Sequence, residues 1–238
     1  MTAGQGRLAG RIALVTGASR GIGAAIAERY AAEGAHVYLV ARTQGGLEEV
    51  YDRIAATGGA ATGVPLDLRQ PEGIERLSAA VHARFGRLDI LVGNAGALGM
   101  LTPVPHLEPG TWEEVMSVNA TANYRLIRSF DPLLRAADAG RAIFVSSGAA
   151  RGGFAYWGAY AASKAALEAL VSCWAAECAK TPLRINTVDP GAVRTRMRAE
   201  AFPGEDPLSL RPPEALADAM VELAEASCTR HGEVVRVR

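Results

Sequence analysis

The sequence predicts an α/β domain in which a parallel sheet of about seven strands carries helices on both faces. Short apolar runs of β type alternate with longer Ala-rich helical stretches, and no internal repeat, low-complexity tract or linker interrupts them. Such alternation implies parallel strands joined by right-handed crossovers. A length of 238 residues is one that a continuous α/β sheet commonly reaches as one unit. We therefore expect a single doubly wound, Rossmann-type domain over residues 1–238.

The expected elements follow one another as strand, helix, strand. The first apolar run, 12–16, leads into a glycine-rich turn and then into an Ala-rich stretch at 23–33. The later strands are expected at 36–41, 61–66, 89–93, 142–146 and 184–188, with a frayed last strand at 233–237. The later helices are expected at 46–57, 71–85, 112–136, 160–180 and 213–225.

The composition excludes several classes of protein. Hydrophobic residues make up 49% and charged residues 21%, which is typical of globular chains. The 25 basic residues balance the 25 acidic residues, so no net field attracts nucleic acid or an anionic membrane. Cys173, Cys178 and Cys228 form no C-x-x-C pair, so we expect neither a disulfide framework nor a metal site. Residues 1–10 lack a signal-peptide pattern and no apolar run reaches about 20 residues, which predicts a soluble, cytoplasmic protein.

Polar or glycine-rich residues follow four of the predicted strands. Ligands of doubly wound sheets bind beyond the carboxyl ends of the strands, where the strand order reverses. We therefore expect these four segments to meet at one crevice. They are Thr16-Gly17, Asn94-Ala95-Gly96, Ser146-Ser147 and Asp189-Pro190-Gly191.

The turn after the first strand is a candidate dinucleotide site. Gly17, Gly21 and Gly23 permit positive φ, close approach of a pyrophosphate and tight packing of helix on strand. Their spacing is G-x-x-x-G-x-G, and a glycine cluster alone is equally well explained by an ordinary turn. The strand before it and the helix after it favour the dinucleotide interpretation.

The residue that ends the second strand predicts the type of cofactor. An acid there binds the ribose 2′-hydroxyl of NAD and repels the 2′-phosphate of NADP. This chain has Ala41, followed by Arg42, and Arg20 lies in the glycine turn. Both guanidinium groups are suitable donors to a phosphate. We therefore expect NADP(H) in preference to NAD(H), although two arginines in so arginine-rich a chain can also lie there by coincidence.

A tyrosine and a lysine at the start of the predicted helix 160–180 can carry acid–base chemistry. Tyr160 and Lys164 are one helical turn apart, on one face. A free tyrosine has a pKa near 10, and an ammonium group and a helix N-terminus both lower it. Ser147, at the end of a predicted strand, is placed to orient a substrate oxygen near the phenol. Each motif alone has an ordinary structural explanation, as an amphipathic pair and as a serine-containing turn.

Taken together in this order, TGASRGIG, NAG, Asn119, SSG, YAASK and PGAVRT resemble the short-chain dehydrogenase/reductase family over nearly the whole chain. The resemblance implies that Tyr160 is the general acid/base, that Ser147 positions the substrate oxygen, and that Lys164 binds the nicotinamide ribose and lowers the pKa of the tyrosine. It also implies that Asn119 anchors a water of the proton relay. The cofactor contacts that it implies are at Gly17, Ser19, Arg20, Gly21, Ile22, Gly23, Arg42, Asp67, Leu68, Asn94, Ala95, Gly96, Tyr160, Lys164, Pro190, Gly191 and Thr195.

Within the family, the chain resembles a bacterial branch of poorly characterised oxidoreductases. Gly93 stands where many members have a further asparagine, so a role of that side chain in steadying the central strand is missing. The chain ends at Val237-Arg238 without the V-D-G-G ending of relatives that form tetramers. We still expect a homodimer or homotetramer, built on the helices 112–136 and 160–180, with Cys173 and Trp174 on an outer apolar face.

Three functions remain open from the sequence. The first is an NADP(H)-dependent oxidoreductase that acts on a carbonyl or secondary alcohol. The second is a catalytically idle NADP(H)-sensing protein, which has no need of the Tyr160 and Lys164 pair. The third is a Rossmann methyltransferase, which usually has an acid after the second strand. The loops at 98–108, 149–157 and 196–212 are expected to wall the substrate pocket with Phe154, Trp157, Met197 and Phe202, which suits a medium-sized apolar carbonyl compound.

Overall fold

The order of the strands places the reversal of the chain between the first and fourth strands. A computed structural model describes residues 6–237 and shows seven parallel strands there, in the order β3-β2-β1-β4-β5-β6-β7. The chain passes from β1 to β2 on one side and from β4 to β5 on the other, so the connections after these two neighbouring strands run in opposite directions. Ligands of such sheets bind at this switch point. The strands are β1 (Ile12–Thr16), β2 (His36–Ala41), β3 (Ala60–Pro65), β4 (Ile90–Gly93), β5 (Arg141–Val145), β6 (Arg184–Asp189) and β7 (Val234–Arg236).

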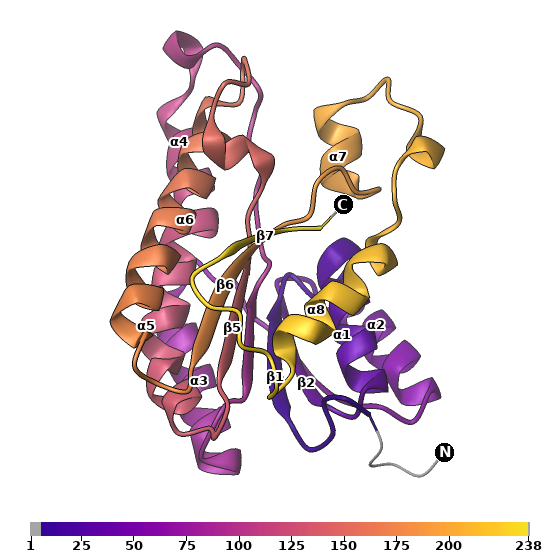
Figure 1. The fold of residues 1–238 in the computed structure, drawn as a ribbon. Helices are drawn as coiled ribbons and strands as arrows, with labels where there is room; N and C mark the ends of the chain where they lie inside the picture. The colour runs from indigo at the N-terminus through magenta and orange to yellow at the C-terminus, as the bar shows by residue number, and fades with distance from the viewer. Residues whose placement is uncertain (1–5, 238) are drawn as a thin grey trace.

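Helices cover both faces of this sheet, which confirms the predicted fold class (Figure 1). On one face lie α3 (Pro71–Phe85), α5 (Ala122–Arg135) and α6 (Gly158–Cys178). On the other lie α1 (Gly21–Ala32), α2 (Gln44–Ala56) and α8 (Ala217–Ala224). The buried side chains form one large apolar cluster on each face, because alternate residues of every central strand point to opposite sides. All five residues of β1 are buried, as expected for the middle of a sheet covered on both sides.

The bounds of β1, β2 and α3 coincide with the predicted ones, and the other boundaries differ from them by at most four residues. The helix expected at 112–136 begins earlier, at Pro109, because a proline suits the first turn of a helix. It runs as α4 (Pro109–Met116), a π-helical segment (Ser117–Thr121) and α5. The short helix α7 (Arg196–Ala201) lies within a segment that the sequence analysis treats as loop, and Thr195 caps it by accepting a hydrogen bond from the Arg198 N–H at 3.2 Å.

The expectation that Trp174 lies on an outer face is wrong. Trp174 is 5% exposed, its ring meets Phe144 of β5 edge-on, and its indole N–H donates to Asp131 at 2.9 Å. The ring can be buried against the sheet because the Asp131 carboxylate accepts the hydrogen bond of its indole N–H. Cys173 is exposed, as expected.

Three expectations are not settled by this architecture. Residues 1–5 and Arg238 lie outside the described residues. The expectations about a signal peptide at 1–10 and about the C-terminal ending therefore fall partly outside them too. The single domain over 1–238 and the homo-oligomer stay predictions. Within residues 6–237, no helix combines the length and apolar character needed to cross a membrane.

Candidate active site

A cleft of about 930 Å³ opens at the carboxyl ends of the strands. All the predicted site residues line it except Gly23 and Asn119, which lie just behind it. The four strand exits therefore meet, as the sequence predicts for a switch point. In Figure 1, α7 lies beyond this end of the sheet. The lining includes Gly17, Ser19, Arg20, Gly21, Ile22, Arg42, Asp67, Leu68, Asn94, Ala95, Gly96, Ser147, Tyr160, Lys164, Pro190, Gly191 and Thr195.

The glycine turn needs its glycines for geometric reasons. Gly17 and Gly21 have φ values of 65° and 57°, which L residues with a side chain rarely adopt. A Cβ on Gly23 would lie 2.3 Å from the carbonyl oxygen of Gly17. The turn thus brings the N-terminus of α1 close to the β1 exit, at the lining of the cleft, and a helix N-terminus in that position suits a phosphate group.

Thr16 and Asn94 fasten the exits of β1 and β4 to one another. The Thr16 hydroxyl oxygen accepts from the backbone N–H groups of Asn94 and Ala95, at 2.9 and 3.1 Å. The Asn94 side chain donates to the Thr16 carbonyl at 2.8 Å. A side chain on Gly93 would collide with the Phe144 ring, 2.4 Å from the Cβ position, and with the Asn123 side-chain oxygen at 2.5 Å. Thr16 was predicted at this exit, but its hydrogen bonds to the β4 exit were not, and their signal is a hydroxyl at the last position of a buried strand.

The end of the cleft beside β2 carries two cations, Arg20 and Arg42, and β2 itself ends without an acid, at Ala41. Arg20 and Arg42 are exposed, and within residues 6–237 neither forms an ion pair. The nearby Asp67 carboxylate is held by Arg69, at 2.5 Å, and hydrogen bonds from Arg69 lower the pKa of Asp67. The two free guanidinium groups are therefore available to an anionic ligand.

Tyr160, Ser147 and Lys164 form the opposite end of the cleft. The Lys164 ammonium donates to the carbonyl oxygen of Val145 at 2.8 Å and lies 5.8 Å from the centroid of the Tyr160 ring. Burial lowers the pKa of Lys164 to about 8, while Glu168 acts to raise it. The Ser147 hydroxyl oxygen accepts from the Ala149 N–H at 3.2 Å and also takes part in a hydrogen bond with the Tyr160 side chain. A phenol, a hydroxyl and an ammonium thus meet within a largely buried pocket.

The expectation of a lowered tyrosine pKa is wrong for the chain without a cofactor. Burial raises the pKa of Tyr160 most, and the Asp189 carboxylate adds to that rise. The hydrogen bond with Ser147 acts in the opposite direction and does not overcome it. Excluding water from the phenolate costs more here than the hydrogen bond with Ser147 returns.

Asn119 acts on the site through the backbone. It is fully buried in the π-helical segment, where its side chain accepts from the Ala97 N–H at 2.7 Å and donates to the Ala97 carbonyl at 2.8 Å and to the Ser163 hydroxyl at 2.9 Å. It therefore ties the loop after β4 to α6. A π turn leaves backbone groups with altered partners and is frequent at functional sites. The water relay stays a prediction.

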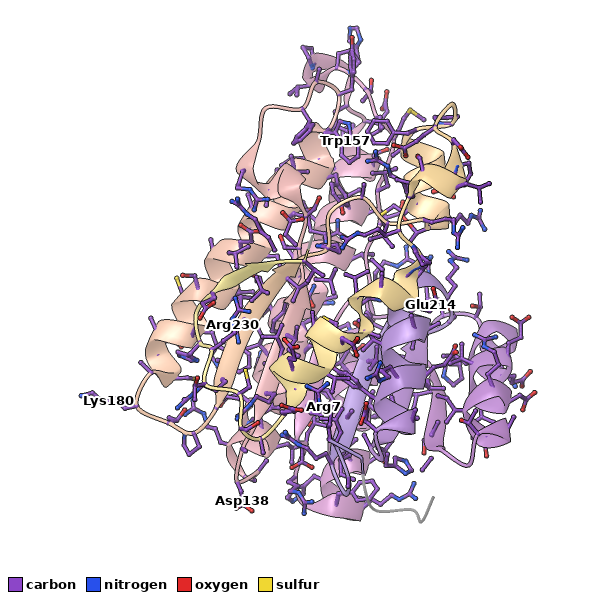
Figure 2. All side chains as sticks on the ribbon, turned by 45° about the vertical axis from the view of Figure 1, so that its right-hand side comes forward. Arg7, Asp138, Trp157, Lys180, Glu214 and Arg230 are labelled. Atoms are coloured by element: carbon purple, nitrogen blue, oxygen red, sulfur yellow. The ribbon has the colours of Figure 1, made fainter. Side chains whose placement is uncertain are left out.

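An apolar wall stands over Tyr160. Leu98, Trp157 and Met197 pack around it in one cluster, and the Trp157 ring also meets Phe202 at 5.7 Å between centroids. Figure 2 shows Trp157 at the end of the molecule where α7 lies, opposite Asp138. The cation of Arg198 lies 3.8 Å above the Phe202 ring and pairs with Glu205 at 2.6 Å, so it is engaged within the segment of α7.

The comparisons with known proteins agree with this geometry. The family model of the short chain dehydrogenases matches residues 11–206. An uncharacterised oxidoreductase of Escherichia coli K12, YciK, is 43% identical over 206 residues, which cover 85% of this chain and 81% of that protein. A fatty acyl-CoA reductase of Acinetobacter baylyi is 38% identical over 213 residues, covering 89% of this chain and 72% of the relative.

A solved structure gives the same result for the fold. The short chain dehydrogenase from Shigella flexneri 2a, crystallised with NADP, superposes with a TM-score of 0.93 at 39% identity and covers 98% of each chain. The two proteins thus share their fold over nearly the whole of both chains. The chain belongs to the short chain dehydrogenase family.

Proposed function

We propose that this protein is an NADP(H)-dependent oxidoreductase that acts on a carbonyl compound or the corresponding secondary alcohol. The observation that carries the proposal is the meeting of Tyr160, Ser147 and Lys164 in the same cleft as the glycine turn. A protein that only senses a nucleotide has no need of a buried phenol beside a hydroxyl and an ammonium. NADP in the Shigella relative supports the choice of cofactor.

The residues present fit a dinucleotide. The cradle at Gly17 admits no side chain, since a Cβ would lie 2.8 Å from Asn94 Nδ2. The pyrophosphate would lie on the backbone of the glycine turn, and the 2′-phosphate would lie between Arg20 and Arg42. Asp67 and Leu68 would flank the adenine. The remaining predicted contacts, at Asn94, Ala95, Gly96, Pro190, Gly191 and Thr195, would line the nicotinamide half.

The chemistry divides between the cofactor and the chain. When bound, the nicotinamide supplies or accepts a hydride. During reduction the Tyr160 hydroxyl donates its proton to the substrate oxygen, and during oxidation the phenolate removes the proton from the alcohol. The Ser147 hydroxyl donates a hydrogen bond to the same oxygen and thus fixes its position. Lys164 binds the ribose hydroxyls, and Asn119 anchors a water of the proton relay to solvent.

The wall over Tyr160 supports an apolar substrate. Trp157, Leu98 and Met197 offer ring and aliphatic surface, and Arg198, beside them, is already paired with Glu205. A ketone or aldehyde on a medium-sized apolar body fits such walls better than a polyol. The fatty acyl-CoA reductase among the relatives agrees with that class.

The test is a panel of ketones, aldehydes and quinones, assayed for NADPH oxidation with NADH in parallel. We expect turnover with apolar carbonyls and NADPH, and little with small polyols. A protein that binds NADPH tightly and turns over no member of the panel would instead be a sensor. We also propose, from the family, a cytoplasmic location, a homo-oligomer and a single domain over residues 1–238. Light scattering tests the oligomeric state.

A further inference from the structure

Three charged side chains outside the cleft lining form a compact group directly behind the reacting residues. They are Arg151, Glu168 and Asp189, with 38%, 18% and 9% of their side chains exposed. Arg151 lies 3.8 Å from the Glu168 carboxylate through one nitrogen and bonds to the Asp189 carboxylate through the other. We refer to these three side chains as the charged brace.

Each member of the brace belongs to a different segment of the site. Arg151 ends the 3₁₀ turn Gly148–Arg151, which begins directly after Ser147. Asp189 is the last residue of β6, directly before Pro190, and its carboxylate accepts from the Gly191 N–H at 3.2 Å. Glu168 lies on α6. The brace therefore joins the segment that carries the substrate-orienting hydroxyl to the segment expected beside the nicotinamide.

Glu168 continues a stripe along α6. Tyr160, Lys164 and Glu168 are spaced four residues apart, so they lie one above another on the face that packs on the sheet. Lys164 bonds to the carbonyl of Val145, and Glu168 accepts from the hydroxyl of Ser146 at 2.6 Å. Lys164 and Glu168 thus form hydrogen bonds to two consecutive residues at the end of β5.

The two acids of the brace also affect the pKa values of Lys164 and Tyr160. A fully buried ammonium is unfavourable, and an acid one helical turn away offsets part of that cost. Glu168 raises the pKa of Lys164. Asp189 raises the pKa of Tyr160, and the Ser147 hydroxyl lowers it. Arg151 pairs with both acids, Glu168 and Asp189. From the other elements that pack on α6, the π-helical segment contributes the neutral Asn119, and α4 contributes Glu114 on the cleft wall.

We propose that Glu168 is a positioning residue of this site: its carboxylate keeps the Lys164 ammonium charged and in place, and Arg151, anchored on Asp189, holds that carboxylate there. One carboxylate oxygen, Oε1, accepts from the Ser146 hydroxyl at 2.6 Å and lies 3.8 Å from an Arg151 nitrogen. A rotation of the side chain that moves this oxygen away loses both partners. The proposal rests on the proposed function for the importance of Lys164, but the charge state can be measured without activity.

The test uses the fact that Lys164 and Lys180 are the lysines of this chain. The full chain is prepared with ¹³C,¹⁵N-labelled lysine, the Lys180→Arg variant assigns the two side-chain signals, and the Lys164 signal is followed by NMR from pH 6 to 11 without cofactor or substrate. We expect a midpoint near 8 for the native chain. In Glu168→Gln, which keeps an oxygen for Ser146, the midpoint falls by about half a unit or more. The matched control is Glu177→Gln, which removes the same charge from an exposed position of the same helix and leaves Lys164 unmoved.

A second variant keeps the proposal falsifiable if Glu168→Gln does not fold. Arg151→Met removes the side chain that holds the Glu168 carboxylate, so we expect the Lys164 midpoint to fall. A rise would show that Arg151 acts on Lys164 only through its own charge and does not hold Glu168 in place. A Lys164 midpoint that moves in neither variant by more than about 0.2 units overturns the proposal. NADPH affinity is then measured across the same pH range by fluorescence. If the midpoint moves and the affinity does not follow it, Lys164 has no role at the cofactor, and the proposed function fails on that point while the role of Glu168 stands.

Discussion

The indole ring of Trp157 stands edge-on to the Tyr160 ring, with the centroids 5.6 Å apart and the planes at 73°. This contact joins the proposed proton donor directly to the wall of the substrate pocket. Trp157 precedes α6, and its carbonyl accepts from the Ala161 N–H at 2.8 Å, so its backbone is fixed by the helix that carries Tyr160. The shape of the pocket and the position of the phenol are therefore set by the same turn.

Removing the indole should weaken the binding of large substrates in particular. For Trp157→Ala we expect the KM of a bulky apolar ketone to rise about tenfold, because an aromatic contact and its buried area are lost. The kcat/KM of a small ketone should change much less. Steady-state kinetics with the two substrates measure the difference. Trp112→Ala, which removes an exposed tryptophan of α4, is the control, and an equal loss for both substrates would show that Trp157 only supports the fold.

Cofactor preference should depend on Arg42. We expect NADPH to bind at least about tenfold tighter than NADH, which corresponds to about 1.4 kcal/mol. Arg42→Asp should reverse this order, because it removes a donor to the 2′-phosphate and adds repulsion. Fluorescence titration with both cofactors measures it, with Arg76→Asp on the exposed surface of α3 as control. If Arg42→Asp still prefers NADPH, another group reads the phosphate.

The glycine turn gives a prediction about stability. In Gly23→Ala the new Cβ would lie 2.3 Å from a backbone oxygen, so α1 or the β1 exit must move. We expect a loss of about 1–3 kcal/mol in the free energy of unfolding and a large loss of NADPH affinity. Gly45→Ala, in α2 and with open space around the added Cβ, should be neutral or slightly stabilising. Urea unfolding compares the two, and equal stability of both variants would contradict the packing argument.

Sequence reasoning found the parts of this protein that local patterns determine. The β1 strand is a run of five buried residues between turn signals, and its bounds at Ile12–Thr16 were predicted without error. The convergence of the strand exits follows from the alternation of strands and helices, because parallel strands present their carboxyl ends at one edge. The motifs then placed nearly all the predicted contacts on one cleft.

What it missed depends on tertiary packing. The inward position of Trp174 depends on Asp131, on another helix, which no periodicity shows. The direction of the Tyr160 pKa depends on how far the surrounding loops exclude water from the phenol. The charged brace joins Arg151 to acids 17 and 38 positions away, and only the fold shows that Arg151 faces both of them.

Tyr160 is the residue on which the proposed function depends most. Tyr160→Phe keeps the ring and its contact with Trp157 and removes the proton donor. Since general acid–base catalysis is commonly worth about 10²–10⁴-fold, we expect turnover to fall by at least about a hundredfold while NADPH affinity changes little. The pH profile has a definite sign: alcohol oxidation by the native chain rises with pH as the phenolate forms, and carbonyl reduction falls over the same range. Because burial raises the pKa of Tyr160 in the free chain, the rise in kcat/KM at low cofactor concentration should come at higher pH than the rise in kcat, in which the positive charge of the oxidised nicotinamide favours the phenolate. Tyr124→Phe, at an exposed position of α5, should reproduce the native profiles. A Tyr160→Phe protein with near-native turnover on its best substrate would remove the phenol from the mechanism.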